Sequence, residues 1–195
     1  MKQPQIILAS ASPRRKQLLD QIAVSCQVMP VDIDESVKAG ESAEDFVSRL
    51  ALEKAAAGYQ RSETKRPVLG SDTIVLLNKQ ILGKPENKAH AIQMLSALSG
   101  HSHQVLTAVA MVSDEKQQCL LNISNVYFRQ LTEEEILTYW ETGEPVDKAG
   151  AYAIQGLAAE FIERIEGSYS GVMGLPLFET AQLLKTFGVT SGQMS

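Results

Sequence analysis

The chain has 195 residues, of which 44% are hydrophobic and 21% are charged. This is sufficient for one sizeable core and marginal for two domains, so we expect a single domain over residues 1–195. The formal net charge of −5 excludes the basic surface that duplex nucleic acid requires. No apolar run is long enough to span a bilayer, and the first one, residues 6–9, is too short for a signal-peptide core. We therefore expect a cytoplasmic protein that binds neither nucleic acid nor a membrane.

Strand and helix patterns alternate along the chain. Ser12 suits the N-cap of the first helix and Pro13 its first position. Ser42 and Asp45 have the spacing of a capping box at the start of the second helix. The predicted strands cover residues 5–9, 24–29, 68–77, 104–112, 118–128 and 161–165, and a polar turn follows at 78–80. The predicted helices cover about residues 13–22, 42–58, 87–98, 132–143 and 176–187.

The order of these elements indicates an α/β fold with a mixed sheet. Alternating strands and helices are typical of a parallel sheet. Residues 104–112 and 118–128, however, flank the polar turn 113–116 and predict a long hairpin. Because a hairpin pairs its strands antiparallel, the sheet cannot be purely parallel. The tail from about Thr190 is polar and is expected to be flexible.

Residues 10–15, with the sequence Ser-Ala-Ser-Pro-Arg-Arg, connect the first strand to the first helix. Backbone N–H groups and the helix dipole make such a connection a site for an anion. Arg14 and Arg15 lie in the first helical turn, where cations oppose the dipole at a cost of roughly a few tenths of a kcal/mol each. A bound anion explains this pair, and two solvated surface arginines are the alternative. A Walker A loop is excluded, because no glycine-rich run ends in Lys-Ser or Lys-Thr.

Lys54 and Asp72 interrupt apolar patterns. Lys54 falls on the buried stripe of the helix 42–58, where it either extends to the edge of the core or enters a cleft and meets a phosphate. Asp72 lies inside the apolar strand 68–77, where burial requires an ion pair, hydrogen bonds or a metal. Such a carboxylate can bind a metal or take a proton from an attacking water. The alternative for Asp72 is a carboxylate in a turn at the strand end.

Other charged and polar residues give weaker indications. Glu35 belongs to an acidic cluster with Asp32 and Asp34 after a strand, which is either a site for Mg²⁺ or a solvated face. His101 and His103 lack a third ligand at metal spacing, so we expect exposed loop histidines rather than a zinc site. The two cysteines are far apart and predict reduced thiols rather than a disulfide framework.

With these motifs assembled, the chain resembles the Maf family of nucleoside triphosphate pyrophosphatases over nearly its whole length. Each motif alone is weak, whereas their order and spacing together are specific. The motifs that carry the resemblance are residues 10–15, 34–35, 49–51, 53–55, 70–73, 83–85, 148–152, 154–156 and 174–176.

The resemblance implies an elongated mixed β-sheet flanked by helices, with two lobes around a cleft, as in the inosine triphosphate pyrophosphatases. It also implies a homodimer that hydrolyses the bond between the α and β phosphates with a divalent cation, Mg²⁺ or Mn²⁺. Asp72 matches the catalytic proton acceptor, and Asp72 and Glu35 match the acids associated with the metal. The positions that match substrate-binding residues are Ser10, Arg14, Arg15, Glu35, Lys54 and Lys84.

At three positions of this family the residue type correlates with the choice of substrate. Here these positions hold Arg14, Thr73 and Gln155. This set resembles the subgroup that acts on dTTP, UTP and modified pyrimidine triphosphates. The subgroup that acts on 7-methyl-GTP instead has another residue, often Trp, after the proline, Gln after the aspartate, and Glu in place of Gln155. The amide of Gln155 offers a donor and an acceptor to uracil or thymine. The alternatives are a pyrophosphatase that removes purine or 7-methyl-GTP nucleotides, and a nucleotide-binding regulator of septum formation.

Overall fold

The computed structural model describes residues 4–192. Its strands are β1 (Ile6–Leu8), β2 (Cys26–Val28), β3 (Val68–Leu77), β4 (Gln80–Leu82), β5 (Ser102–Val112), β6 (Gln117–Phe128) and β7 (Ile162–Glu166). Its helices are α1 (Pro13–Gln21), α2 (Ala43–Arg61), α3 (Lys88–Leu98), α4 (Glu133–Glu141), α5 (Tyr169–Met173) and α6 (Leu177–Thr186), with short 3₁₀ helices η1 (Ala149–Ala151) and η2 (Leu157–Phe161). Within residues 4–192, none of the helices combines the length and the apolar character that crossing a membrane requires.

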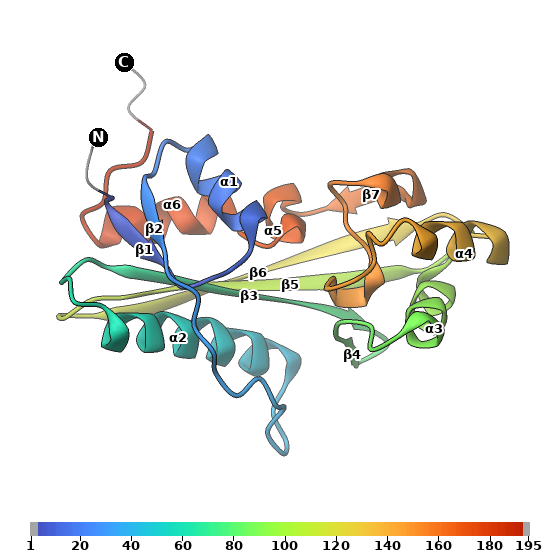
Figure 1. Ribbon diagram of the computed structural model, residues 1–195, viewed down its shortest axis with the longest axis horizontal. Coiled ribbons are helices and arrows are strands. Elements are labelled where there is room, and N and C mark those ends of the chain that lie inside the picture. Colours follow the sequence, from blue (N-terminus) through green and yellow to red (C-terminus); the bar gives the residue numbers. More distant parts are fainter. Residues whose placement is uncertain (1–3, 193–195) are drawn as a thin grey trace. The chain divides into compact units, whose positions relative to one another are not determined.

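The strands of this region form one seven-stranded mixed sheet (Figure 1). The order is β2-β1-β3-β5-β6-β7, and β4 also pairs with β3. β1 runs parallel to β2 and β3, whereas β4 and β7 pair antiparallel with β3 and β6. β5 and β6 are neighbours joined by a short turn, in which Ser113 N donates to Lys116 O at 2.9 Å. The predicted α/β fold with a mixed sheet flanked by helices is therefore confirmed.

Side-chain hydrogen bonds cap the starts of α2 and α4, where the sequence predicts capping residues. Ser12 is the N-cap of α1 by position, without a side-chain capping bond, and Pro13 is the first residue of the helix. Ser42 Oγ accepts a hydrogen bond from the backbone N–H of Asp45 at 3.0 Å, and α2 begins at the next residue. In α4, Thr132 and Glu135 form a complete capping box. These bonds satisfy N–H groups that have no partner inside the helix, which is why the capping residues mark the boundaries.

The predicted turn at residues 78–80 was too long by one residue, because Gln80 begins β4. Asn78 and Lys79 both have positive φ, 49° and 69°, and make a two-residue hairpin turn. Gln80 then pairs with Leu77 across the hairpin. β4, η1, η2 and α5 were not predicted from the sequence. They contain only three to five residues, which is too short for a helical or strand period to be visible.

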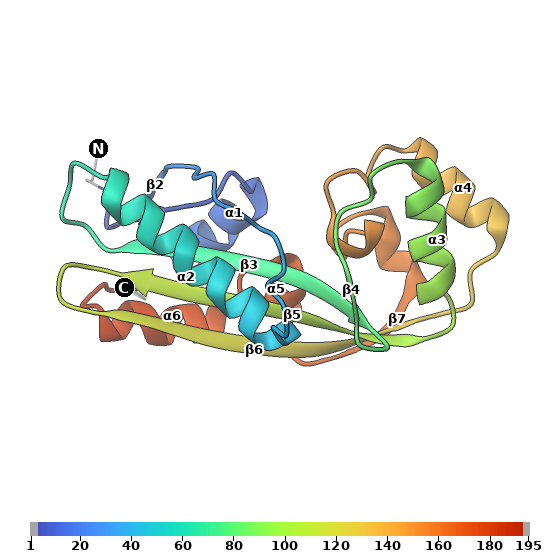
Figure 2. The same ribbon diagram turned by 90° about the horizontal axis from the view of Figure 1, so that it is seen from below.

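The chain divides into two compact units. The described residues of the first are 4–72, 107–122 and 174–192, and those of the second are 73–106 and 123–173. In the first unit, α2 covers one face of the sheet, and α1 and α6 cover the other (Figures 1 and 2). Near the predicted tail, Gln5 Nε2 donates to Thr190 O and Gly192 N donates to Ile22 O, both at 2.9 Å. The end of that tail, residues 193–195, lies outside the described residues.

In the first unit, Gly70 lets α2 lie close to β3. A Cβ atom at this position would be 2.3 Å from the carbonyl oxygen of Ala51 and 2.6 Å from the backbone nitrogen of Ala55. Both atoms belong to the α2 backbone and cannot turn aside as a side chain can. The absence of a side chain at Gly70 therefore sets the spacing between α2, which carries Lys54, and β3, which carries Asp72.

In the second unit, α3 packs against α4 (Figure 2), and the core contains a group of aromatic rings. His103 belongs to this group, so its prediction as an exposed loop residue was wrong. It lies in β5, is 3% exposed, and its Nε2 is 2.8 Å from the hydroxyl of Tyr152. Its ring meets Phe128 edge to face at a centroid distance of 5.1 Å. An imidazole and a phenol can be buried here because each satisfies a polar atom of the other.

Candidate active site

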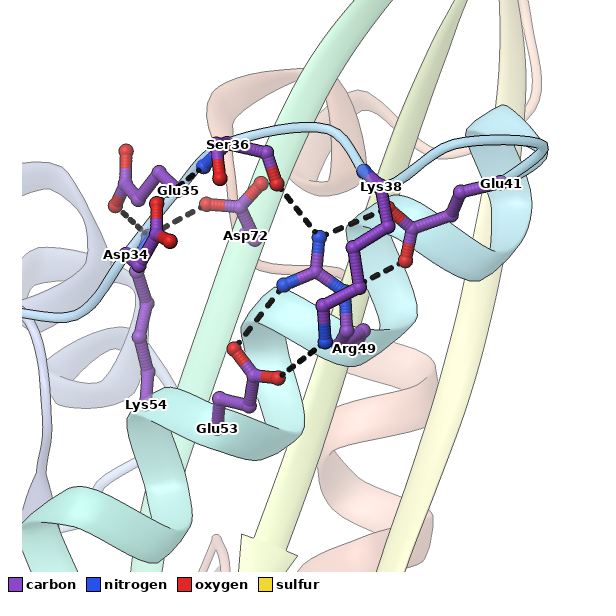
Figure 3. A network of polar contacts seen from close by, with 9 residues as sticks. All are labelled: Asp34, Glu35, Ser36, Lys38, Glu41, Arg49, Glu53, Lys54 and Asp72. Atoms are coloured by element: carbon purple, nitrogen blue, oxygen red, sulfur yellow. Dashed lines mark hydrogen bonds and ion pairs between the residues drawn. The ribbon is translucent and has the colours of Figure 1, made fainter.

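Lys54 lies at the centre of a charged cluster in the first unit (Figure 3). Its ammonium nitrogen is 2.6 Å from Asp72 Oδ1 and 2.6 Å from Glu35 Oε1. Lys54 and Asp72 are 9% and 8% exposed, whereas about half of the Glu35 side chain is exposed. Lys54 therefore does not extend to the surface as a lone cation. The cluster joins α2, β3 and residues 29–42, which we call the acidic loop.

The alternation of side chains along β3 explains why Asp72 faces Lys54. Side chains of a strand point to opposite faces in turn, so Asp72 projects from the same face as Gly70. Gly70 lies against the backbone of α2. A carboxylate on this face would be costly to bury alone, and the ammonium of Lys54 compensates its charge.

Ser10 and Arg15 form a second part of the same unit. Arg15 Nη1 donates to Ser10 Oγ at 3.0 Å, and Arg15 Nε donates to the carbonyl oxygen of Gly174 at 2.8 Å. Burial lowers the pKa of Arg15, and the negative charges of Asp72 and Glu35 act in the opposite direction. Arg15 is therefore held in a fixed direction and lies within the electrostatic field of the Lys54 cluster.

The start of α1 keeps the features of an anion site. The side chain of Ser12 makes no capping hydrogen bond, and the first turn of α1 contains no acidic residue. Arg14 lies in this turn and is partly buried, which lowers its pKa. The positive end of the helix dipole thus adds to the charges of Arg14 and Arg15, and phosphate oxygens suit such a position.

Three of the predicted site residues belong to the second unit. Thr73 is partly buried in β3, directly after Asp72. Lys84 is exposed in the segment before α3, and Gln155 is exposed between η1 and η2. Their roles toward a substrate stay predictions.

Glu35 and Asp72 were predicted to bind a metal, and their arrangement allows this in one way. Residues 4–192 contain no group of three or more His, Cys, Asp or Glu side chains that could hold a metal ion by themselves. The two carboxylates nevertheless converge on a single cationic group, the ammonium of Lys54. Mg²⁺ is commonly held by one or two carboxylates together with substrate phosphates and water. The residues therefore fit a divalent cation whose coordination is completed by a polyphosphate.

Ser71 and the carbonyl of Gly174 support the site and were not predicted. Ser71 is fully buried, and its Oγ lies 2.8 Å from Ala108 O and 3.1 Å from Gly174 O. Because a hydroxyl has one proton, these two hydrogen bonds are alternatives. The same Gly174 oxygen accepts from Arg15. A hydroxyl inside an apolar strand was a visible signal for Ser71, whereas a backbone carbonyl has no signal in the sequence.

Comparison with known proteins gives matches over most of the chain. A family model described as Maf-like protein matches residues 5–187. The dTTP/UTP pyrophosphatase of Alkalilimnicola ehrlichii is 54% identical over 191 residues, covering 95% of this chain and 94% of that protein. The dTTP/UTP pyrophosphatase of Vibrio parahaemolyticus is 50% identical over 182 residues, covering 93% and 96%. A solved structure of a nucleoside-triphosphatase / dITP/XTP pyrophosphatase from Mycobacterium abscessus aligns with a TM-score of 0.42 and 16% identity, covering 65% of this chain and 75% of that one.

Proposed function

The chain belongs to the Maf-like protein family, and from this we propose that it is a nucleoside triphosphate pyrophosphatase that hydrolyses dTTP and UTP to the monophosphate and pyrophosphate. Relatives that are 50–54% identical and match it nearly end to end are named for this activity. The observation that carries the proposal is the buried pair of Lys54 and Asp72, with Glu35 on the same ammonium. A binding protein has no need of a buried carboxylate beside cations that suit phosphates.

In the reaction, Asp72 orients the attacking water and takes its proton. The water oxygen forms a bond to the α phosphorus. The bond from this phosphorus to the oxygen that bridges the α and β phosphates breaks, and pyrophosphate leaves. Lys54, Arg14 and Arg15 stabilise the negative charge that develops on the phosphate oxygens, and Lys84 adds a further cation. Ser10 orients Arg15 through the hydrogen bond at 3.0 Å.

Glu35 and Asp72 are the residues that would hold Mg²⁺ or Mn²⁺ together with the phosphates. Such a cation supplies positive charge that neutralises the triphosphate and polarises the phosphoryl oxygens. Lys54 contacts both carboxylates and keeps them facing one another, so that they form one acidic site.

Arg14, Thr73 and Gln155 select the base in this proposal. The amide of Gln155 can donate to one position and accept from the next on the edge of uracil or thymine. A site that pairs with these positions leaves its own polar groups unsatisfied when a base with another pattern binds, and this discriminates against that base.

We also expect a cytoplasmic homodimer.

The test is pyrophosphate release from dTTP, UTP, CTP, dITP, XTP and 7-methyl-GTP with Mg²⁺, and again with a chelator. We expect the highest kcat/KM for dTTP and UTP and loss of turnover with chelator. A purine preference would overturn the role of Gln155 in favour of the purine alternative. Tight binding of dTTP without hydrolysis would favour a nucleotide-binding regulator.

The Asp72→Asn variant belongs to the same test, because it keeps the size of the side chain and removes its ability to take a proton. We expect kcat to fall by about 10²- to 10⁴-fold, the usual contribution of a general base. The matched control is Asp114→Asn, because Asp114 is an exposed carboxylate of the same unit, 3.5 Å from Lys65. Circular dichroism should show both variants folded, and wild-type turnover by Asp72→Asn would exclude Asp72 as the base.

A further inference from the structure

Arg49 and Glu41 form a largely buried ion pair between α2 and the acidic loop (Figure 3). Arg49 Nε donates to Glu41 Oε1 at 2.6 Å, and Arg49 Nη2 donates to Glu41 Oε2 at 2.8 Å. The two side chains are only 15% and 9% exposed. Two parallel bonds from one guanidinium to one carboxylate fix the direction of both groups, which distinguishes this pair from an exposed surface ion pair.

The same guanidinium also holds the loop backbone beside Glu35. Arg49 Nη2 donates to the carbonyl oxygen of Ser36 at 3.0 Å, and Nη1 donates to Glu53 Oε2 at 3.1 Å within α2. The backbone N–H of the same Ser36 donates to Oδ1 of Asp34, the residue on the other side of Glu35, at 2.9 Å. Arg49 is therefore anchored on α2 and reaches the acidic loop at Ser36 and at Glu41.

Lys38 makes further contacts in the acidic loop, between Ser36 and Glu41. Its backbone N–H donates to Glu41 Oε2 at 3.1 Å, and its carbonyl accepts from the backbone N–H of Glu41 at 3.1 Å. Its ammonium lies 3.5 Å from Glu53 Oε1. The segment from Ser36 to Glu41 is thus tied to one face of α2 by side chains of α2 itself.

From this geometry we infer that Arg49 is a positioning residue that holds Glu35 against Lys54. Glu35 lies in a loop without regular secondary structure, and about half of its side chain is exposed. Its carboxylate reaches Lys54 only if the backbone at Ser36 stays in place. Arg49 lies little more than one helical turn before Lys54, so one rigid helix sets the position of both. The inference rests on the proposed function, in which Glu35 helps to hold the cation and the phosphates.

Arg49→Lys is the variant that tests this role, because lysine keeps the charge but cannot make two parallel bonds to Glu41 and a third to Ser36. We expect the Mg²⁺ concentration for half-maximal activity to rise and kcat/KM for dTTP to fall by about 10- to 100-fold, as for a displaced site group. The matched control is Arg66→Lys, which alters a partly buried arginine of the same unit that makes a solvent-exposed hydrogen bond to Gln27 Oε1. It should behave as the wild type.

A double-mutant cycle with Glu35→Gln separates positioning from a general structural effect. If Arg49 acts through Glu35, Arg49→Lys lowers activity strongly in the wild type and by less than about twofold in the Glu35→Gln background. Equal losses in both backgrounds would overturn the inference, and so would wild-type activity of Arg49→Lys. Glu41→Gln breaks the same pair from the loop side and should reproduce the result if Arg49→Lys folds poorly.

Amide hydrogen exchange of residues 33–41 gives a second readout that does not depend on turnover. We expect faster exchange of this segment in Arg49→Lys and Glu41→Gln, and unchanged exchange in Arg66→Lys. If the wild-type protein released no pyrophosphate from any triphosphate, the proposed function would fail, and exchange would still decide whether Arg49 holds the loop. Unchanged exchange of this segment in both Arg49→Lys and Glu41→Gln would refute the positioning role.

Discussion

His103 shows how a single buried side chain makes stability depend on pH. It is 3% exposed, and among the described residues its Nδ1 has no hydrogen-bond partner. Burial lowers its pKa from 6.5 to about 4. Between these values the unfolded chain binds a proton and the folded chain does not, so the free energy of unfolding falls as the pH drops from about 6.5 to about 4. The fall is about 3 kcal/mol at most, and urea unfolding at about pH 7 and about pH 4.5 measures it.

The His103→Gln variant removes this titration, so its stability should change less over the same pH range. His101→Gln is the matched control, since His101 lies beside it in the chain and is less buried. That variant should keep the pH dependence of the wild type. If the free energy of unfolding of His103→Gln depended on pH as strongly as that of the wild type, groups other than His103 would be responsible.

At the same scale, charges that interrupt apolar patterns made part of the site visible in the sequence. Lys54 on a buried helical stripe and Asp72 inside an apolar strand were both singled out, and they form one ion pair at 2.6 Å. Arg49 gave no such signal, because it lies off the buried stripe of α2, four residues from Asp45 and from Glu53. Its partner Glu41 lies in an irregular loop, and the path of such a loop depends on tertiary contacts rather than on a local period.

At the scale of elements, the contact of α2 with β3 should be sensitive to one methyl group. Gly70→Ala places a Cβ atom 2.3 Å from the backbone oxygen of Ala51, so the helix and the strand must move apart. We expect a loss of stability of about 1–3 kcal/mol, typical of an overpacked core. Pyrophosphate release should also fall, because Lys54 moves with the helix away from Asp72. The urea midpoint and the rate measure the two effects.

Gly83→Ala is the stability control for this variant, because a Cβ atom at Gly83 would meet nothing within 4 Å. Its urea midpoint should stay close to that of the wild type. If Gly70→Ala also kept the wild-type midpoint and rate, α2 and β3 would be able to adjust, and Gly70 would not set their spacing.

The elements themselves could be predicted where their signals are local. Capping side chains located the starts of α2 and α4, the Ser12-Pro13 pair located the start of α1, and the apolar run 68–77 predicted both ends of β3. The strand order could not be predicted, because pairing of β1 with both β2 and β3 depends on contacts between distant segments. The positive φ values at Asn78 and Lys79 likewise belong to the folded hairpin, and without them β4 is hidden in a polar turn.

For the whole molecule, the proposed function requires that a chain of net charge −5 bind a polyanion through a few converging cations. A ligand that binds only the folded state stabilises it by about 2.7 kcal/mol at a hundred times its Kd. For a chain of this size we therefore expect dTTP with Mg²⁺ to raise the Tm of Asp72→Asn by about 5–10 °C. This variant is chosen because it should bind the triphosphate without consuming it, and differential scanning fluorimetry measures the shift.

The pattern of shifts separates binding of the phosphates from recognition of the base. Adding Arg15→Gln to Asp72→Asn should remove most of the shift for every nucleotide if Arg15, which Ser10 and Gly174 hold in place, binds the phosphates as the proposed function requires. If Gln155 recognises the base as proposed, replacing dTTP by 7-methyl-GTP should reduce the shift with Arg15 intact, since the Gln155 amide suits uracil or thymine. Equal shifts with both nucleotides would mean that the protein binds the triphosphate alone, and selection of pyrimidines would then have to arise during hydrolysis rather than in binding.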